Sequence, residues 1–203
     1  MKKIFVFVLL LLLVTGCTRI DNEENYKKIV DSVPKSSNTL NVATTGYKFY
    51  LPKGVRVVKD LDFNQELVVN NTNMYLYVDI VSYYYKNFTN NNDDANYNYY
   101  YEKLSGNDGD FGYIAIQKEE EEYFVKIVYN YAKIELYTTK DKLSSIISYA
   151  TLILKSIEYN DTVIDKFISD NNITSSDTLY SIDKPSDSES KFSQYLQEYV
   201  HEE

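Results

Sequence analysis

The segments FGYIAIQ (111–117), YFVKIVY (123–129) and KIELYT (133–138), followed by LSSIISYATLILKSI (143–157), decide the fold. The first three are rich in β-branched and aromatic residues, which favour strands. In the fourth, apolar residues recur at intervals of three and four, which predicts a helix of about four turns with one face in the core. Strands in a run followed by a helix indicate the α+β class.

Further strand-like segments precede these four, separated by Asn- and Gly-rich turns. We expect strands over 47–51, 55–58, 65–69, 74–85 and 99–104. The longest is 74–85, in which apolar and polar residues alternate at first. The sequence therefore predicts an antiparallel sheet with helices packed on it. Helical spacing of apolar residues also predicts short helices over 23–33, 163–168 and 192–200.

The composition divides the chain into four parts. We expect a signal peptide over 1–16, a tether with a short helix over 17–45, an α+β domain over 46–159 and a C-terminal helical extension over 160–203.

The N-terminal part has the features of an export signal. Lys2 and Lys3 are followed by an unbroken apolar run from Ile4 to Val14. This run is too short for a helix to cross the roughly 30 Å hydrocarbon core of a bilayer. A basic start, a short apolar run and small residues after it are typical of a secretory signal.

The four residues that follow carry a more specific motif. Val14-Thr15-Gly16-Cys17 resembles the lipobox of bacterial lipoproteins, in particular small uncharacterised lipoproteins of Gram-positive bacteria. The resemblance implies that the peptide is cut before Cys17 and that a diacylglycerol is attached to its sulfur. Two acyl chains make such an anchor durable. The expected location is therefore the extracytoplasmic face of the cell membrane.

Charge and cysteine content agree with this interpretation. Cys17 is the only cysteine, so no intramolecular disulfide is possible. Residues 1–16 contain two lysines and no acid, so their removal changes the formal charge from −9 to −11. Such an excess of acid argues against nucleic-acid binding, which needs surplus Lys and Arg. It also predicts repulsion from anionic headgroups, with the domain held off the bilayer by its tether.

Three polar features are candidates for reactive or metal-binding sites. His201 is the single histidine and lies near the end of the sequence, where we expect a frayed residue. Asn107-Asp108-Gly109-Asp110 lacks the further oxygen ligands of a calcium loop and is interpreted as a turn. Glu119–Glu122 is interpreted as a solvated hairpin tip. We therefore predict no catalytic residue, no metal and no cofactor.

Tyrosine is the unusual component, with 22 residues and runs at 83–85 and 99–101. Tyrosines on one face of a sheet offer stacking surface for sugars or peptides. They are also simply favoured in strands. The order of elements is similar to the PsbP-like sandwich fold. This resemblance rests on Tyr47–Gly54 and Leu143–Ile157, and it implies no catalytic residues.

The sequence thus predicts a lipid-anchored, non-enzymatic module that binds a protein or a cell-wall glycan outside the cytoplasm. The alternative is a small solute-binding lipoprotein of a transport system. Two-lobed proteins of that class usually need more than the 187 residues left after cleavage, and βα alternation. A hydrolase that uses carboxylates alone stays open, because sequence does not show whether two acids share a pocket.

Overall fold

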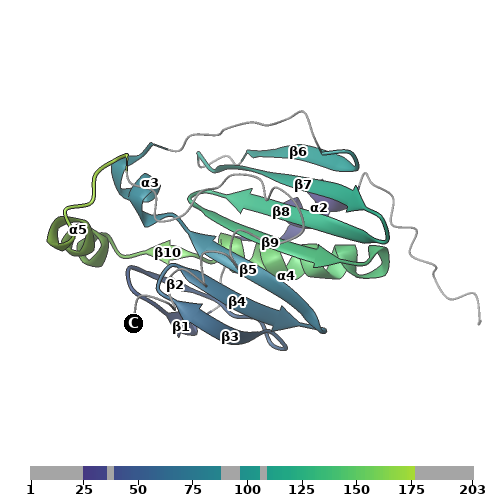
Figure 1. Ribbon diagram of the computed structural model, residues 1–203, viewed down its shortest axis with the longest axis horizontal. Coiled ribbons are helices and arrows are strands. Elements are labelled where there is room, and N and C mark those ends of the chain that lie inside the picture. The colour runs from purple at the N-terminus through teal and green to yellow at the C-terminus, as the bar shows by residue number, and fades with distance from the viewer. Residues whose placement is uncertain (1–24, 36–38, 88–96, 106–108, 177–203) are drawn as a thin grey trace, which may run out of the picture.

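The structure is a computed structural model that describes residues 25–35, 39–87, 97–105 and 109–176 (Figure 1). It confirms the α+β class. The larger sheet consists of β3 (Arg56–Leu61), β4 (Asn64–Val69), β5 (Thr72–Val78), β6 (Tyr100–Ser105), β7 (Phe111–Glu119), β8 (Glu122–Tyr129) and β9 (Ala132–Thr138). These seven strands are antiparallel neighbours in the order β3-β4-β5-β9-β8-β7-β6.

A second, small sheet lies beside the first. It consists of β1 (Val42–Ala43), β2 (Tyr47–Phe49) and β10 (Glu158–Tyr159), with β2 in the centre. This sheet brings together segments far apart in the chain, because β1 and β2 precede the large sheet while β10 follows the last strand of the large sheet and the helix after it. The boundary expected at residue 46 therefore lies inside this small sheet.

Helices lie on one face of the large sheet and at one end of its strands (Figure 1). The helices are α2 (Asn25–Ser32), α3 (Ile80–Tyr85), the short 3₁₀ turn η1 (Lys140–Lys142), α4 (Leu143–Lys155) and α5 (Asp161–Asp170). Figure 1 shows α4 running behind β8 and β9, with α2 beside it. The apolar stripe expected for 143–157 is buried in this interface: Leu143, Ile146, Ile147, Ala150, Ile153 and Leu154. No helix of the described ranges is long and apolar enough to cross a bilayer.

The β7–β8 hairpin forms as expected, with Ile114 opposite Ile127 and Ile116 opposite Val125. Gly112 lies where the two backbones approach closely. A Cβ atom there would overlap the carbonyl oxygen of Val128, so only glycine fits without a shift of the backbone.

The expectation of one long strand over 74–85 is wrong in its second half. The strand ends at Val78, and Ile80–Tyr85 form helix α3. Asp79 starts this helix, because its carboxylate accepts a hydrogen bond of 2.9 Å from the amide of Ser82. An N-cap of this kind outweighs the strand preference of the tyrosines that follow.

The short helix expected within 17–45 is present as α2, and it belongs to the core. Tyr26 and Val30 are fully buried, in the same apolar cluster as the sheet and α4. The amide of Lys27 donates to the hydroxyl of Tyr100 in β6, 3.2 Å away. Folded structure therefore begins by residue 26, which leaves only 18–24 between the predicted anchor and the described domain.

Candidate functional site

The predicted lipid-attachment motif Val14, Thr15, Gly16 and Cys17 lies outside the described residues, as do His201 and the helix expected over 192–200. What the structure adds is the position of the chain that follows the motif. Asn25 is the first described residue, eight positions after Cys17.

The molecule has two distinct ends along the strand direction (Figure 1). We call one the hairpin end, defined by the β7–β8 turn at Glu119–Glu122 and by η1. The other, the α3–α5 end, is defined by helices α3 and α5. These two ends face opposite directions, because every strand of the large sheet connects one to the other.

Three consecutive tyrosines of α3 attach this helix to α5 and the residues after it. The Tyr83 hydroxyl donates to Asp161 at 2.7 Å, and the Tyr84 hydroxyl donates to Asp165 at 2.8 Å. The Tyr85 hydroxyl donates to the carbonyl oxygen of Ile173 at 2.8 Å. The run at 83–85 is therefore a helix–helix contact, where the sequence indicated a sheet face.

An aromatic cluster lies behind this contact. Tyr83 stacks on Tyr159 with 3.9 Å between ring centroids, and its edge meets Tyr131 at 5.4 Å. The ammonium of Lys86 lies 3.7 Å from the centroid of the Tyr83 ring, a cation–π contact. Burial, followed by the adjacent carboxylate of Asp161, raises the pKa of Tyr83 to about 12.

The accessible apolar side chains gather at the same end. Among the described residues, four large hydrophobic side chains are exposed, and three of them belong to α3 and α5: Tyr84, Tyr85 and Val163. By contrast, Tyr77 and Tyr113 on the large sheet are buried. The two most exposed tyrosines of the described residues are thus on α3, while Tyr75, Tyr100, Tyr101 and Tyr137 of the large sheet are half-buried.

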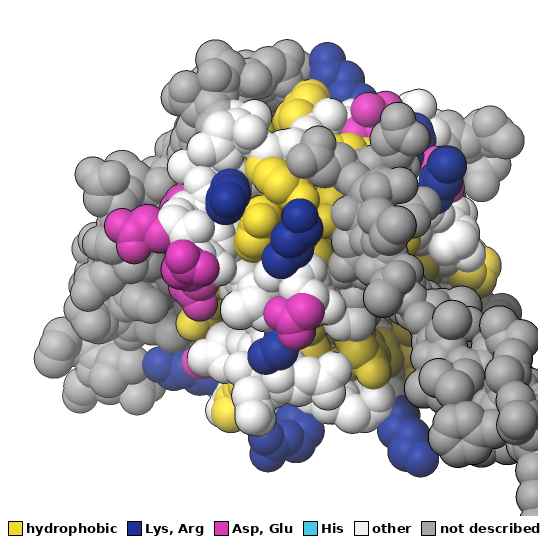
Figure 2. Space-filling view, turned by 90° about the vertical axis from the view of Figure 1, so that its right-hand side faces the viewer, with side chains coloured by type: hydrophobic (Ala, Val, Ile, Leu, Met, Phe, Trp, Pro, Cys, Tyr) yellow, Lys and Arg dark blue, Asp and Glu magenta, His cyan; other side chains and the backbone are white. Residues whose placement is uncertain are grey.

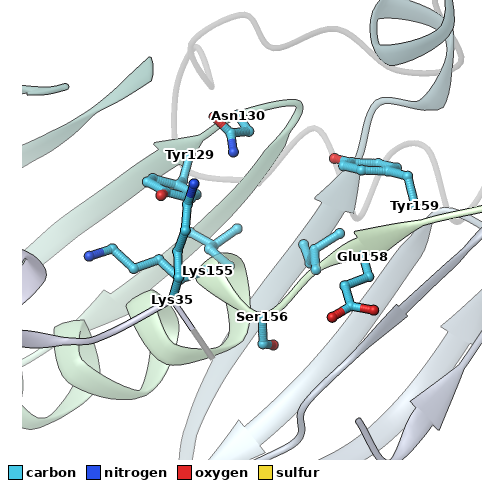
Figure 3. Close-up of a pocket in the computed structure, with 9 residues that line it drawn as sticks. Lys35, Tyr129, Asn130, Lys155, Ser156, Glu158 and Tyr159 are labelled. Carbon is cyan, nitrogen blue, oxygen red and sulfur yellow. The ribbon is translucent and has the colours of Figure 1, made fainter. Parts of the chain in front are cut away.

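A pocket of about 280 Å³ opens between the C-terminus of α4, the β8–β9 turn and β10. Figure 3 shows Lys35, Lys155 and Tyr129 on one side of it and Tyr159 on the other. Asn130, Ser156 and Glu158 complete its polar lining. The pocket therefore offers cationic and hydroxyl groups, which suit a small anionic or hydroxylated molecule.

Asp110 organises the part of this lining near Tyr129. Its carboxylate lies 2.7 Å from the ammonium of Lys35 and accepts bonds from the Tyr129 hydroxyl at 2.6 Å and the Asn130 amide at 3.2 Å. Burial opposes ionisation most strongly, but the three donors together outweigh it and lower the pKa of Asp110. Asn107 and Asp108 of the predicted turn lie outside the described residues, and Asp110 serves as a structural carboxylate.

The acidic tip Glu119–Glu122 lies at the β7–β8 turn, as predicted. Glu120 adopts a left-handed backbone with φ of 49°, and Glu120 to Glu122 are exposed. Within the part of the chain that the structure describes, no group of three or more His, Cys, Asp or Glu side chains is placed to hold a metal ion.

Comparison of the chain with protein-family models, with curated proteins and with solved structures finds no match. The likeness to lipoproteins and to a PsbP-like sandwich stays a prediction from the residues.

Two features of the site were not predicted from the sequence. The first is the cap at Asp79, which an Asp directly before the apolar residues Ile80 and Val81 signals in principle. The second is the contact of Tyr83 with Asp161, which joins residues far apart in the chain. No local pattern reveals such a pair.

Proposed function

We propose that this chain is a lipid-anchored extracytoplasmic protein that acts by binding a partner protein and not by catalysis. The observation that carries the proposal is the spacing of anchor and domain. A basic and apolar leader ends in Val14-Thr15-Gly16-Cys17, and the first buried core residue, Tyr26, follows after a segment of only eight residues. A lipid at Cys17 would hold this core at the membrane surface.

The α3–α5 end is the binding surface that the exposed residues favour. Tyr84 and Tyr85 meet edge to face with 5.0 Å between ring centroids, and both remain partly exposed. Tyrosines offer large apolar area at low entropic cost, which is why they are enriched in protein interfaces. Figure 1 shows α5 projecting from this end of the molecule. A projecting surface suits a protein partner better than a glycan or a metabolite, which bind in concave sites.

A solute-binding role is less well supported. The buried residues form one main core and not two lobes that close on a ligand. In the pocket, the ammonium of Lys35 pairs with Asp110, and that of Lys155 donates to two backbone carbonyls. A solute would have to compete with these contacts.

Anchoring is tested by the intact mass of the protein extracted from membranes with detergent. The expected mass lacks residues 1–16 and includes a diacylglycerol. The Cys17→Ser variant is expected to keep its leader and to carry no lipid. A wild-type mass without acyl chains in the membrane fraction would refute the proposal.

Binding is tested by a photo-crosslinking amino acid placed at Tyr85 in intact cells. Position 58 is the matched control, because Val58 is exposed but lies on β3. We expect one defined protein adduct from position 85 and none from position 58. Equal adducts from both positions, retention of the purified domain on cell-wall glycan, or a raised melting temperature with a metabolite would each favour another function.

A further inference from the structure

We infer that the anchored protein has a fixed polarity: the hairpin end faces the bilayer and the α3–α5 end is displayed away from it. This inference rests on the proposed anchoring at Cys17. It follows from the length of the connection, from the place where the connection enters the fold and from the size of the domain.

The connection is short whatever conformation it adopts. Eight peptide units separate Cys17 from Asn25, and a fully extended chain spans no more than about 29 Å over that number. A flexible chain of the same length has a root-mean-square span of about 16 Å. Asn25 is therefore held close to the membrane surface.

The connection enters the domain at the hairpin end. Tyr26 packs edge to face on Tyr100, with 5.3 Å between ring centroids. Tyr100 lies opposite Ile116 in β7, three residues before this strand ends at Glu119. The other end of α2 points the opposite way, because the carbonyl of Val30 accepts a hydrogen bond from Lys155 at the end of α4. Figure 1 agrees, with α5 at the far side of the molecule.

The domain is as long as the extended connection. β7 has nine residues, which corresponds to about 30 Å along the strand. Helix α5 lies beyond the ends of the strands at the far side. Bringing α5 to the bilayer would require the connection to be almost fully stretched, at a large cost in chain entropy. The orientation with the hairpin end toward the bilayer needs no stretching.

Charge at the hairpin end does not oppose this orientation. Figure 2 views the molecule from that side and shows Lys or Arg and Asp or Glu side chains on one face. Exposed Lys118 and Lys140 lie at this end together with the acidic tip Glu119–Glu122. Charges of both signs partly cancel at a distance from the surface, where salt also screens them. The length of the connection therefore sets the polarity.

The test uses the fact that the chain contains no tryptophan. Glu121→Trp places a single donor at the hairpin end, and Val163→Trp places one on α5; both original side chains are exposed. Each lipidated variant is extracted from membranes and inserted into phosphatidylcholine vesicles that contain a dansyl-labelled headgroup as energy acceptor. We expect energy transfer from position 121 to exceed that from position 163 by at least about threefold, given their separation along the strands.

Equal or reversed transfer from lipidated protein would overturn the polarity and leave the anchoring intact. Variants whose mass lacks the diacylglycerol, with no transfer from either position, would overturn the anchoring and the polarity together. As a further control, about 20 Gly and Ser residues inserted after residue 24 lengthen the connection and should remove the difference between the two positions. A difference that survives this insertion would mean that the surface and not the connection determines orientation, which contradicts the inference. Unchanged thermal unfolding of each variant confirms that it is folded.

Discussion

The ammonium group of Lys155, the last residue of α4, donates a hydrogen bond of 2.7 Å to the carbonyl oxygen of Val30 in α2. A second bond of the same length goes to the carbonyl of Val33. The last carbonyls of a helix have no partner within the helix, and a cation near them is favourable. The side chain of Lys155 thus caps the C-terminal end of α2 and attaches this helix to α4.

Replacing Lys155 with Met should therefore lower the free energy of unfolding by about 1.5–3 kcal/mol, because two carbonyls lose a charged donor. Met keeps the apolar stem of the side chain, so packing changes little. Urea denaturation measures the effect, with Lys166→Met on the exposed side of α5 as control. Equal stability of the two variants would show that this contact does not hold α2 to the domain.

Asp79 provides a second prediction. Its side-chain oxygen stabilises the start of α3, while its buried charge destabilises the folded state. Asp79→Ala removes the acceptor for the Ser82 amide and should cost about 1 kcal/mol of stability. Burial raises the pKa of Asp79, and the bonds from Ser82 only partly offset this. A raised pKa means that folding disfavours the ionised carboxylate of Asp79. Above the ordinary pKa of the group, its charge therefore lowers the stability of the folded state.

Asp79→Asn keeps an oxygen acceptor without a charge. At pH 7 this variant should therefore be at least as stable as the wild type, while Asp79→Ala is less stable. Thermal unfolding of the three proteins side by side makes the comparison. If Asn were as damaging as Ala, the charge and not the cap would be the stabilising feature.

The elements predicted correctly are those in which one pattern dominates. The spacing of Leu143, Ile146 and Ile147 fits only a helix, and two runs of β-branched and aromatic residues on either side of an acidic turn fit the β7–β8 hairpin. Helix α3 was missed because the tyrosines at 83–85 favour strands, while a single carboxylate at Asp79 decides the outcome. The candidate binding end depends on contacts between α3 and α5, which lie about 80 residues apart in the chain. Such contacts follow from the packing of the whole chain and not from local preference.

The pKa of Tyr83 gives a prediction about alkaline pH. The pKa of this phenol is raised from 10.0 to about 12 in the folded protein. The neutral form is thus stabilised by folding, and its contribution is complete below pH 10 and is lost as the pH rises from 10 through 12. Tyr83→Phe should therefore show a smaller loss of stability over this range than the wild type.

The measurement is urea denaturation at several pH values between 9 and 12. Tyr75→Phe serves as control, because Tyr75 lies in β5, away from the α3–α5 contact. Parallel curves for the wild type and Tyr83→Phe would mean that Tyr83 titrates as in the unfolded chain.

Glu135 provides the last prediction, because it lies in a buried group of charges on the sheet face opposite α4. Its carboxylate is 2.9 Å from the ammonium of Lys133 and 3.7 Å from that of Lys126, its direct neighbour across β8 and β9. All three side chains are at most 4% exposed. Removal of one member of a buried ion group costs about 3–5 kcal/mol, because the opposite charges stay behind. Glu135→Met should therefore destabilise the protein by this amount, measured by urea denaturation.

The triple variant Lys126→Met, Lys133→Met and Glu135→Met removes the charges together and should recover most of that loss, because apolar side chains of similar size fit a buried site. Comparing the single and the triple variant separates the cost of an unpaired buried charge from the cost of altered packing. A loss below about 1 kcal/mol for Glu135→Met alone would show that water reaches these groups, since exposed ion pairs contribute no more than that. A triple variant less stable than the single one would show instead that the three charges are a net source of stability on this face of the sheet.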